Sequence, residues 1–146
     1  MDRLTFDGNR KLFRGKNEKG IWVFGSLLQC QDVFGNSEVF IYQSEKTGNW
    51  RQHKILDSKT IAQFTGYTLN GQDVFEKDIL YFEEKYVGLI CFGPYQKDFG
   101  SSNTEHLGFY VEWTTLVNGY PEPYRLFRKD LGYWLRNEKV VIAKGT

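Results

Sequence analysis

Several residue types and features are scarce in this sequence of 146 residues, and each absence argues against a class of protein. Alanine, the best helix former, occurs only at Ala62 and Ala143, which argues against a helical bundle. No apolar run approaches the roughly 20 residues that a membrane-spanning helix needs, and the first residues lack the apolar stretch of a signal peptide. We therefore expect a cytoplasmic protein with no membrane partner.

Cysteine and histidine are also rare, with two residues of each type. Cys30 and Cys91 follow or interrupt apolar runs, so we predict free, buried thiols in a reducing compartment. His53 and His106 combine with these cysteines in no spacing typical of zinc ligands. The G-x-S-x-G elbow of hydrolases and the glycine-rich loops that bind phosphate are missing as well. The sequence therefore predicts no metal, no cofactor and no enzyme activity.

The charge balance gives little sign of a polyanion partner. Charged residues make up 25% of the chain and the formal net charge is +1. A strongly basic protein that coats DNA and an acidic mimic of DNA are both excluded on this ground. Any contact with nucleic acid would have to come from a local basic patch.

Aromatic residues are abundant at 17% of the chain, and they favour a pleated, β-rich core. The clearest strands, at 21–28 and 38–42, are predicted to form a hairpin around a turn at 32–37. Asn70-Gly71 predicts a second tight turn. Further extended segments are predicted at 50–56, 60–64, 78–82, 87–92, 108–113 and 140–142. The polar stretch 93–107 has no periodicity and is predicted to be a mobile loop.

One segment departs from the β pattern. Between residues 124 and 136, apolar side chains recur at the helical spacing i, i+4, i+7, i+8, and they are Phe127, Leu131, Trp134 and Leu135. We predict one amphipathic helix near the C-terminus. With no repeat, linker or low-complexity tract, the chain is predicted to form a single domain over residues 1–146.

Two sequence blocks stand out in the middle of the chain: T-I-A-Q-F-T-G at 60–66 and N-G-Q-D-V-F-E-K-D-I at 70–79. They are preceded by L-F-R-G-K at 12–16 and W-V-F-G-S-L at 22–27. In this order the segments resemble the YopX family of phage and prophage proteins. The resemblance extends over residues 11–92. It implies a phage-encoded accessory protein with a barrel-like antiparallel sheet and a suggested nucleic-acid partner, and it offers no catalytic residue.

Two features of this signature allow a physical interpretation. Lys77 stands where the family often has glycine, and an unusual backbone angle there would strain Lys77. We expect an ordinary exposed turn at this position instead. Glu76 and Asp78 flank a strand start and can accept backbone hydrogen bonds. A metal or general-base site at these two carboxylates is the alternative, with weak support because no histidine is near in sequence.

A basic strip is predicted on the helix. Arg125, Arg128, Lys129 and Arg136 share one face with Gly132, opposite the apolar stripe. Such a row of cations suits a phosphate backbone, although a solvated helix face would look the same.

A second basic cluster lies near the N-terminus. Lys11, Arg14, Lys16 and Lys19 surround Trp22, and basic residues beside an aromatic ring suit single-stranded nucleic acid. A charged turn beside core aromatics is the other interpretation.

The leading prediction is therefore a mainly β, non-catalytic accessory protein that binds nucleic acid. The alternative is a protein-interaction module, self-assembling into a homo-oligomer or acting on a host or phage protein. Its mark would be an exposed apolar patch or an unpaired strand edge.

Overall fold

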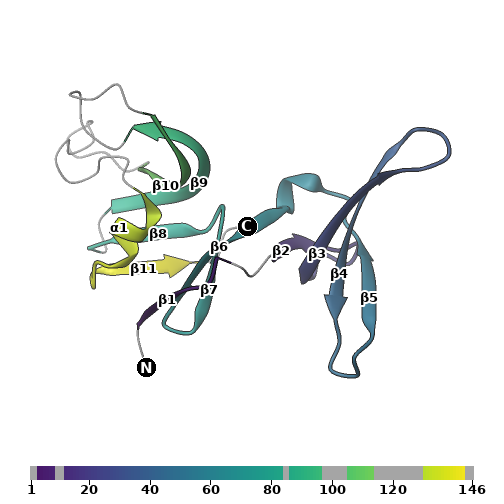
Figure 1. Ribbon diagram of the computed structural model, residues 1–146, viewed down its shortest axis with the longest axis horizontal. Helices are drawn as coiled ribbons and strands as arrows, with labels where there is room; N and C mark the ends of the chain where they lie inside the picture. The colour runs from purple at the N-terminus through teal and green to yellow at the C-terminus, as the bar shows by residue number, and fades with distance from the viewer. Residues whose placement is uncertain (1–2, 9–11, 84–85, 97–104, 114–129, 144–146) are drawn as a thin grey trace. The chain divides into compact units, whose positions relative to one another are not determined.

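The computed structural model describes residues 3–8, 12–83, 86–96, 105–113 and 130–143 (Figure 1). Strands make up 63% of these residues and helices 7%, which confirms the mainly β prediction with one short C-terminal helix. All paired strands are antiparallel. The expected barrel is wrong for the described residues, because the sheets end at edge strands and do not close.

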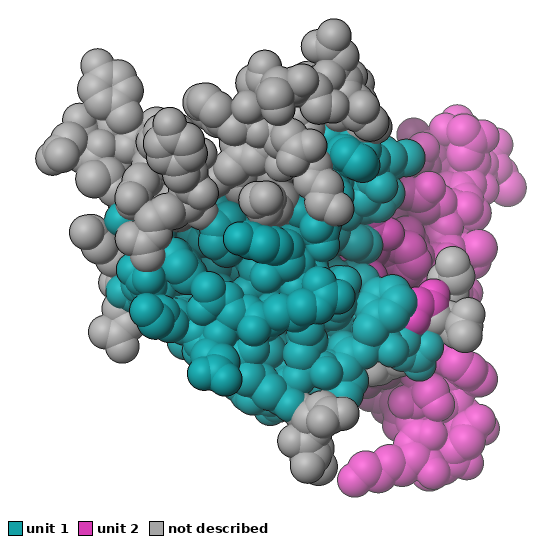
Figure 2. All heavy atoms as spheres, turned by 60° about the vertical axis from the view of Figure 1, so that its left-hand side comes forward, with its two compact units in different colours: residues 1–7, 65–146 teal, residues 8–64 magenta. Residues whose placement is uncertain are grey.

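The chain divides into two compact units (Figure 2). Unit 1 contains residues 1–7 and 65–146, and unit 2 contains residues 8–64. The long strand β6 (Ala62–Leu69) starts in unit 2 and ends in unit 1. The single domain predicted over residues 1–146 stays a prediction.

Unit 2 is a meander of antiparallel strands. Its strands are β2 (Phe13–Lys16), β3 (Trp22–Gln31), β4 (Ser37–Ser44) and β5 (Trp50–Lys54), followed by the 3-10 turn η1 (Ser58–Thr60) and the start of β6. The sheet order runs from β6 through β2, β3 and β4 to β5, so β5 is an edge strand. The predicted hairpin is confirmed as β3 and β4, which pair from Ser26 opposite Tyr42 to Gln31 opposite Ser37.

The core of unit 2 is small. Only Val23, Ile41 and Ile55 form its fully buried cluster, and four partly buried side chains pack against it: Phe13, Leu27, Val39 and Ile61. One glycine lets β3 approach β4. A Cβ on Gly25 would collide with the Tyr42 carbonyl, so β3 could not lie against β4 there with a larger residue.

Unit 1 combines a short sheet with a four-stranded sheet. In the short sheet, β1 (Leu4–Phe6) and β7 (Gln72–Phe75) both pair with β6. Asn70 and Gly71 form the turn between β6 and β7. Both residues have a positive φ, as a tight hairpin turn requires. The four-stranded sheet has the order β10-β9-β8-β11. Its strands are β8 (Ile79–Phe82), β9 (Tyr86–Gln96), β10 (Glu105–Trp113) and β11 (Val140–Ala143).

An aromatic cluster holds the helix of unit 1 against this sheet. The rings of Trp113 and Trp134 meet edge to face with centroids 4.9 Å apart, and Phe82 packs on Trp134 at 5.6 Å. Edge-to-face pairs of this kind contribute about 0.5–1.5 kcal/mol beyond the area they bury. The cluster belongs to a buried core of 12 residues, so unit 1 has much the larger core.

The helix α1 (Leu131–Leu135) confirms the C-terminal part of the predicted helix, with Asp130 accepting a hydrogen bond from the Tyr133 amide at its start. The predicted residues 124–129 lie outside the described residues. Gly132 is buried, and a Cβ there would collide with the Tyr67 hydroxyl. The prediction that Gly132 lies on a solvated face is therefore wrong, because the glycine lets this face of the helix approach Tyr67.

Two other expectations are corrected. Residues 93–96 and 105–107, predicted as loop, belong to strands β9 and β10, whose long ladder extends to the pair Gln96 and Glu105. Neither cysteine is in a disulfide, as predicted, but Cys30 is exposed and Cys91 only half-buried, which corrects the expected burial. Cys30 lies at the end of β3, where residues 28–31 are all exposed, so neither face of the strand is covered there.

The turn between β7 and β8 contains the end of the signature. Asp78 is fully buried, and its Oδ2 accepts a hydrogen bond of 2.9 Å from the Phe75 amide. Lys77 has φ 73°, in the left-handed region. The structure thus confirms the backbone-bonding role predicted for Asp78. The ordinary exposed turn expected at Lys77 is wrong, because this half-buried residue takes the left-handed angle that favours glycine.

We expect Lys77→Gly to raise the free energy of unfolding by about 0.5–1 kcal/mol, because glycine adopts a positive φ without strain. Chemical denaturation of the variant beside wild type measures the change. Lys77→Ala is the control, since it removes the same side chain and keeps the strain. An equal gain from both variants would show that side-chain contacts, and not φ, are responsible.

Replacing Asp78 should weaken unit 1. Asp78→Ala leaves the buried Phe75 amide without its acceptor, and we expect a loss of about 1–3 kcal/mol in thermal or chemical unfolding. Asp78→Asn retains an oxygen acceptor and should lose less. An Asp78→Ala variant as stable as wild type would contradict the structural role.

Candidate functional site

The β3–β4 hairpin and β5 form a sheet whose second face is rich in apolar side chains. Directly paired residues share a face. Leu28 therefore lies in one row with Phe40 and Lys54, and Tyr42 lies between Ser26 and Gln52 in the next row. This face, which we call the outer face, is opposite the small core that contains Val23 and Ile41. On this face Leu28 is exposed, while Phe40 and Tyr42 are half-buried.

A shallow groove of about 390 Å³ opens on the outer face. We call it the hairpin groove, and it is lined by Ser26, Leu27, Leu28, Tyr42 and Trp50. Trp50 is 61% exposed and Leu28 is 44% exposed. Every lining residue is apolar, aromatic or an uncharged hydroxyl, so the groove is suited to an apolar group.

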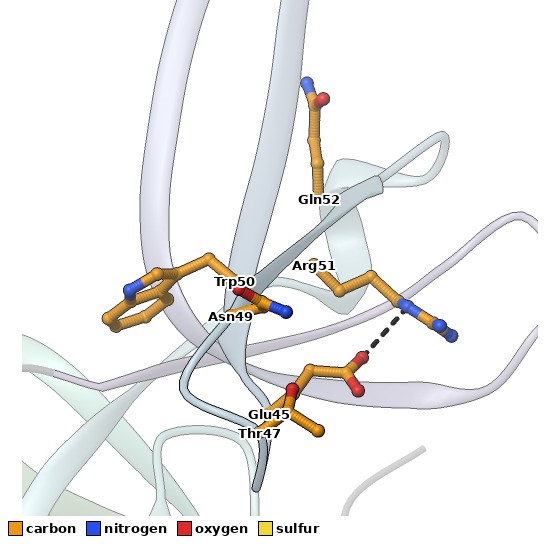
Figure 3. Close-up of a pocket in the computed structure, with 6 residues that line it drawn as sticks. All are labelled: Glu45, Thr47, Asn49, Trp50, Arg51 and Gln52. Carbon is orange, nitrogen blue, oxygen red and sulfur yellow. Dashed lines mark ion pairs between the residues drawn. The ribbon is translucent and has the colours of Figure 1, made fainter.

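The charged side chains near the groove lie close to opposite charges. Arg51 Nε lies 2.9 Å from Glu45 Oε1 at the turn between β4 and β5, as Figure 3 shows, while Trp50 extends from the other side of the strand. Lys54 Nζ lies 3.7 Å from Glu38 Oε1. Arg51 is part of a polar recess of about 390 Å³ around this turn. The outer face therefore has no uncompensated cluster of positive charge among its described residues.

The turn that joins β3 to β4 exposes two large apolar side chains. Val33 is 92% exposed and Phe34 is 86% exposed, the highest values among the exposed large hydrophobic residues described. We call this pair the hairpin tip. Figure 1 shows the turn at the far end of the long β3–β4 ribbon. Turns are normally built from polar residues and glycine. Apolar side chains as exposed as these bury little surface and contribute little to the stability of the fold.

Asp32 orders the turn beneath the hairpin tip. Its Oδ1 accepts hydrogen bonds from the amides of Phe34 at 2.8 Å and Asn36 at 2.9 Å, and its Oδ2 accepts one from the Asn36 side chain at 3.1 Å. Gly35 supplies the positive φ of 84° that the turn needs. The two apolar side chains are thus presented on a fixed loop.

The hydrogen bonds to Asn36 also change the acidity of Asp32. Donation from the Asn36 main chain and then from its side chain holds the pKa of the Asp32 carboxyl below its ordinary value of 3.8, with a smaller contribution from the Phe34 amide. Asp32 is therefore ionised throughout the neutral range, and its negative charge lies at the foot of the turn that presents the hairpin tip.

The N-terminal basic cluster has an arrangement that sequence alone did not suggest. Arg14 is only 2% exposed, and its guanidinium carbon lies 4.8 Å from the centroid of the Trp22 ring. Lys16 Nζ lies 5.0 Å from the same centroid. Cations already lie over this ring, so it is a poor platform for a stacked base. Lys19 is exposed on the adjacent turn, and Lys11 lies outside the described residues.

Of the predicted basic strip, only Arg136 is described. It is exposed at the end of α1 in unit 1. Arg125, Arg128 and Lys129 lie outside the described residues, so the strip as a whole stays a prediction. The sequence prediction missed the hairpin tip and groove; the signal available was an apolar pair, Val33-Phe34, inside a turn that begins with Asp and ends with Gly-Asn.

Within the described residues, no group of three or more His, Cys, Asp or Glu side chains could hold a metal ion. No helix in this part of the chain is long and apolar enough to cross a membrane. Comparisons with family models, curated proteins and solved structures found no match to the chain. The YopX resemblance accordingly stays a prediction, and function must be argued from the hairpin itself.

The turn chemistry predicts a pH response. Folding lowers the pKa of Asp32, so the ionised carboxylate stabilises the turn. This stabilisation is fully present above the pKa of the unfolded chain, and it is lost as the pH falls through the lower pKa of the folded chain. We expect the amide NMR signals of Phe34 and Asn36 to titrate with one midpoint below 3.8. Asp32→Asn should abolish that titration. A midpoint at or above 3.8 would contradict the hydrogen-bonded turn.

Proposed function

We propose that this chain is a non-catalytic protein-binding module that engages its partner through the β3–β4 hairpin. The observation that carries the proposal is the hairpin tip, where Val33 and Phe34 are almost fully exposed on a turn ordered by Asp32. Exposed apolar groups clustered in this way mark interaction sites. Because the turn is ordered before binding, little conformational entropy is lost when a partner covers it.

The charges of the hairpin support a protein partner over a polyanion. The ribbon contains Asp32 and Glu38 and no basic residue between Trp22 and Ser44. Two cations of the neighbouring strand β5, Arg51 and Lys54, lie beside acidic partners. A phosphate backbone needs the reverse balance. Nucleic-acid binding, the leading prediction from the sequence, is now supported only by the predicted basic strip at residues 125–136.

Site-specific photocrosslinking tests the proposal. We would place a photoreactive phenylalanine at position 34 and, as the matched control, at Leu56, which is 67% exposed in the same unit but off the hairpin. We expect a defined protein adduct from position 34 and none from position 56. Wild-type protein with unlabelled Phe34 shows the background.

Two results would overturn this function. The first is the absence of any protein adduct at position 34. The second is salt-sensitive binding of labelled oligonucleotides that is lost when Phe34 is changed to Asp, which would assign the hairpin to nucleic acid. Loss of such binding only in Arg125→Ala/Arg128→Ala/Lys129→Ala would instead support the strip as a separate nucleic-acid site.

A further inference from the structure

Strand β3 pairs with different strands along its two halves. β2 pairs with residues 22–25, and β4 pairs with residues 26–31. Among the strands that the structure describes, none pairs with residues 26–31 on the side away from β4. Figure 1 shows this half of β3 in the long ribbon that it forms with β4. We call residues 26–31 the β3 edge.

A backbone hydrogen bond shows which residues of the β3 edge point outward. In an antiparallel pair, the N–H and C=O groups of alternate residues point toward the partner strand. The Asp32 amide, directly after β3, donates to the Asn36 carbonyl at 2.8 Å, so the even-numbered residues face β4. The backbone groups of Leu27, Gln29 and Gln31 therefore point away from β4, where the described part of the chain supplies no partner strand.

The β3 edge has none of the features that usually prevent strand addition. Natural edge strands are kept from pairing by charged side chains, proline or a β-bulge. Residues 26–31 read S-L-L-Q-C-Q, and their ladder to β4 is continuous. Residues 28–31 are all exposed. The β3 edge is thus a template on which an extended segment can pair.

The edge strand on the other side of β4 is protected by charge. β5 includes Arg51 and Lys54, and each lies beside an acidic side chain. Charged side chains on an edge strand oppose the approach of another strand. In β3, by contrast, no residue between Trp22 and Gln31 is charged. The β3 edge is therefore better suited than β5 to pairing with another chain.

We propose that the protein partner contributes an extended, uncharged segment that adds to the β3 edge as an antiparallel strand. The inference rests on the proposed function and names the form in which that partner binds. Main-chain hydrogen bonds hold a segment added in this way, and its alternate side chains set the specificity. The direction is antiparallel because an antiparallel ladder is slightly more stable per residue than a parallel one.

The two faces of β3 determine which side chains the segment carries. Its residues opposite Leu27, Gln29 and Gln31 exchange hydrogen bonds with them, and uncharged polar side chains suit the exposed amides there. Its residues opposite Leu28 and Cys30 lie on the outer face, where the 44% exposed Leu28 favours apolar side chains. The segment therefore alternates apolar and uncharged polar residues, and its continuation past Gln31 lies beside the hairpin tip.

A hexapeptide of alternating valine and threonine, attached to a short polyethylene glycol chain for solubility, is a direct probe of the full chain. We expect it to protect the amides of Leu27, Gln29 and Gln31 from hydrogen exchange measured by NMR. The amides of Leu28 and Cys30 are protected with or without the peptide, because they pair with β4. They are the internal control.

N-methylated peptides give a sharper result. In the antiparallel register the threonine N–H groups face β3 and the valine N–H groups face solvent. Methylating the threonines should weaken binding at least about tenfold, because the hydrogen bonds of the added strand are lost, and methylating the valines should not. Equal binding of the two methylated peptides, or no protection by the parent peptide, would overturn strand addition. Protection that rises with protein concentration and no peptide would assign the edge to a second copy and overturn a separate partner.

Variants of Gln29 test the edge with the natural partner. In a chain with photoreactive phenylalanine at position 34, Gln29→Pro removes an outward N–H and should lower the adduct yield at least about tenfold. Gln29→Ala retains the N–H and should leave the yield unchanged, and circular dichroism shows that both variants are folded. An adduct that Gln29→Pro leaves at the wild-type level would overturn strand addition while the proposed function stands. No adduct in any chain, wild type at position 29 included, is instead the failure of the proposed function.

Discussion

Alternation along strand β3 is the constraint from which the surface of unit 2 follows. Each residue must point to the face opposite its neighbours, so a strand that supplies Val23 and Leu27 to the core also sends Leu28 and Cys30 outward. Pairing with β4 and β5 extends this division to whole rows. Because the core of unit 2 is small and lies on one face, Leu28 on the other face stays exposed and Phe40 and Tyr42 are only half-buried. The proposed binding function would use this apolar surface.

The two units use aromatic residues in different ways. In unit 1, Trp113, Trp134 and Phe82 are buried together where the helix meets the sheet, and they stabilise the fold. In unit 2, Phe34 and Trp50 are largely exposed and contribute little to folding. Composition alone cannot separate these roles, since a ring in the core and a ring on a binding surface count equally toward an aromatic content of 17%. The difference lies in which face of which strand each ring occupies.

The local elements were largely predictable because their signals are short-range. The hairpin of β3 and β4 follows from two β-branched and aromatic runs around a Gly-Asn turn, and the β6–β7 turn follows from Asn70-Gly71. The backbone-bonding role of Asp78 was also foreseen. Predictions failed where distant residues decide. Residues 93–96 and 105–107 have no periodicity of their own, and only their mutual pairing makes them strand. Gly132 is buried because Tyr67, far away in sequence, lies against it.

The same distinction applies to function. By itself the sequence determined that the chain is mainly β, that its net charge is near zero, and that it contains no familiar catalytic motif, because these properties depend on composition and neighbouring residues. Tertiary structure decided that Arg14 is buried beside the half-buried Trp22, and that Val33, Phe34, Leu28 and Trp50 are exposed. Exposure depends on what packs against a side chain from elsewhere in the chain, and no local pattern contains that information. The sequence therefore points to the basic residues as a candidate site, whereas the exposure seen in the fold points to the apolar hairpin.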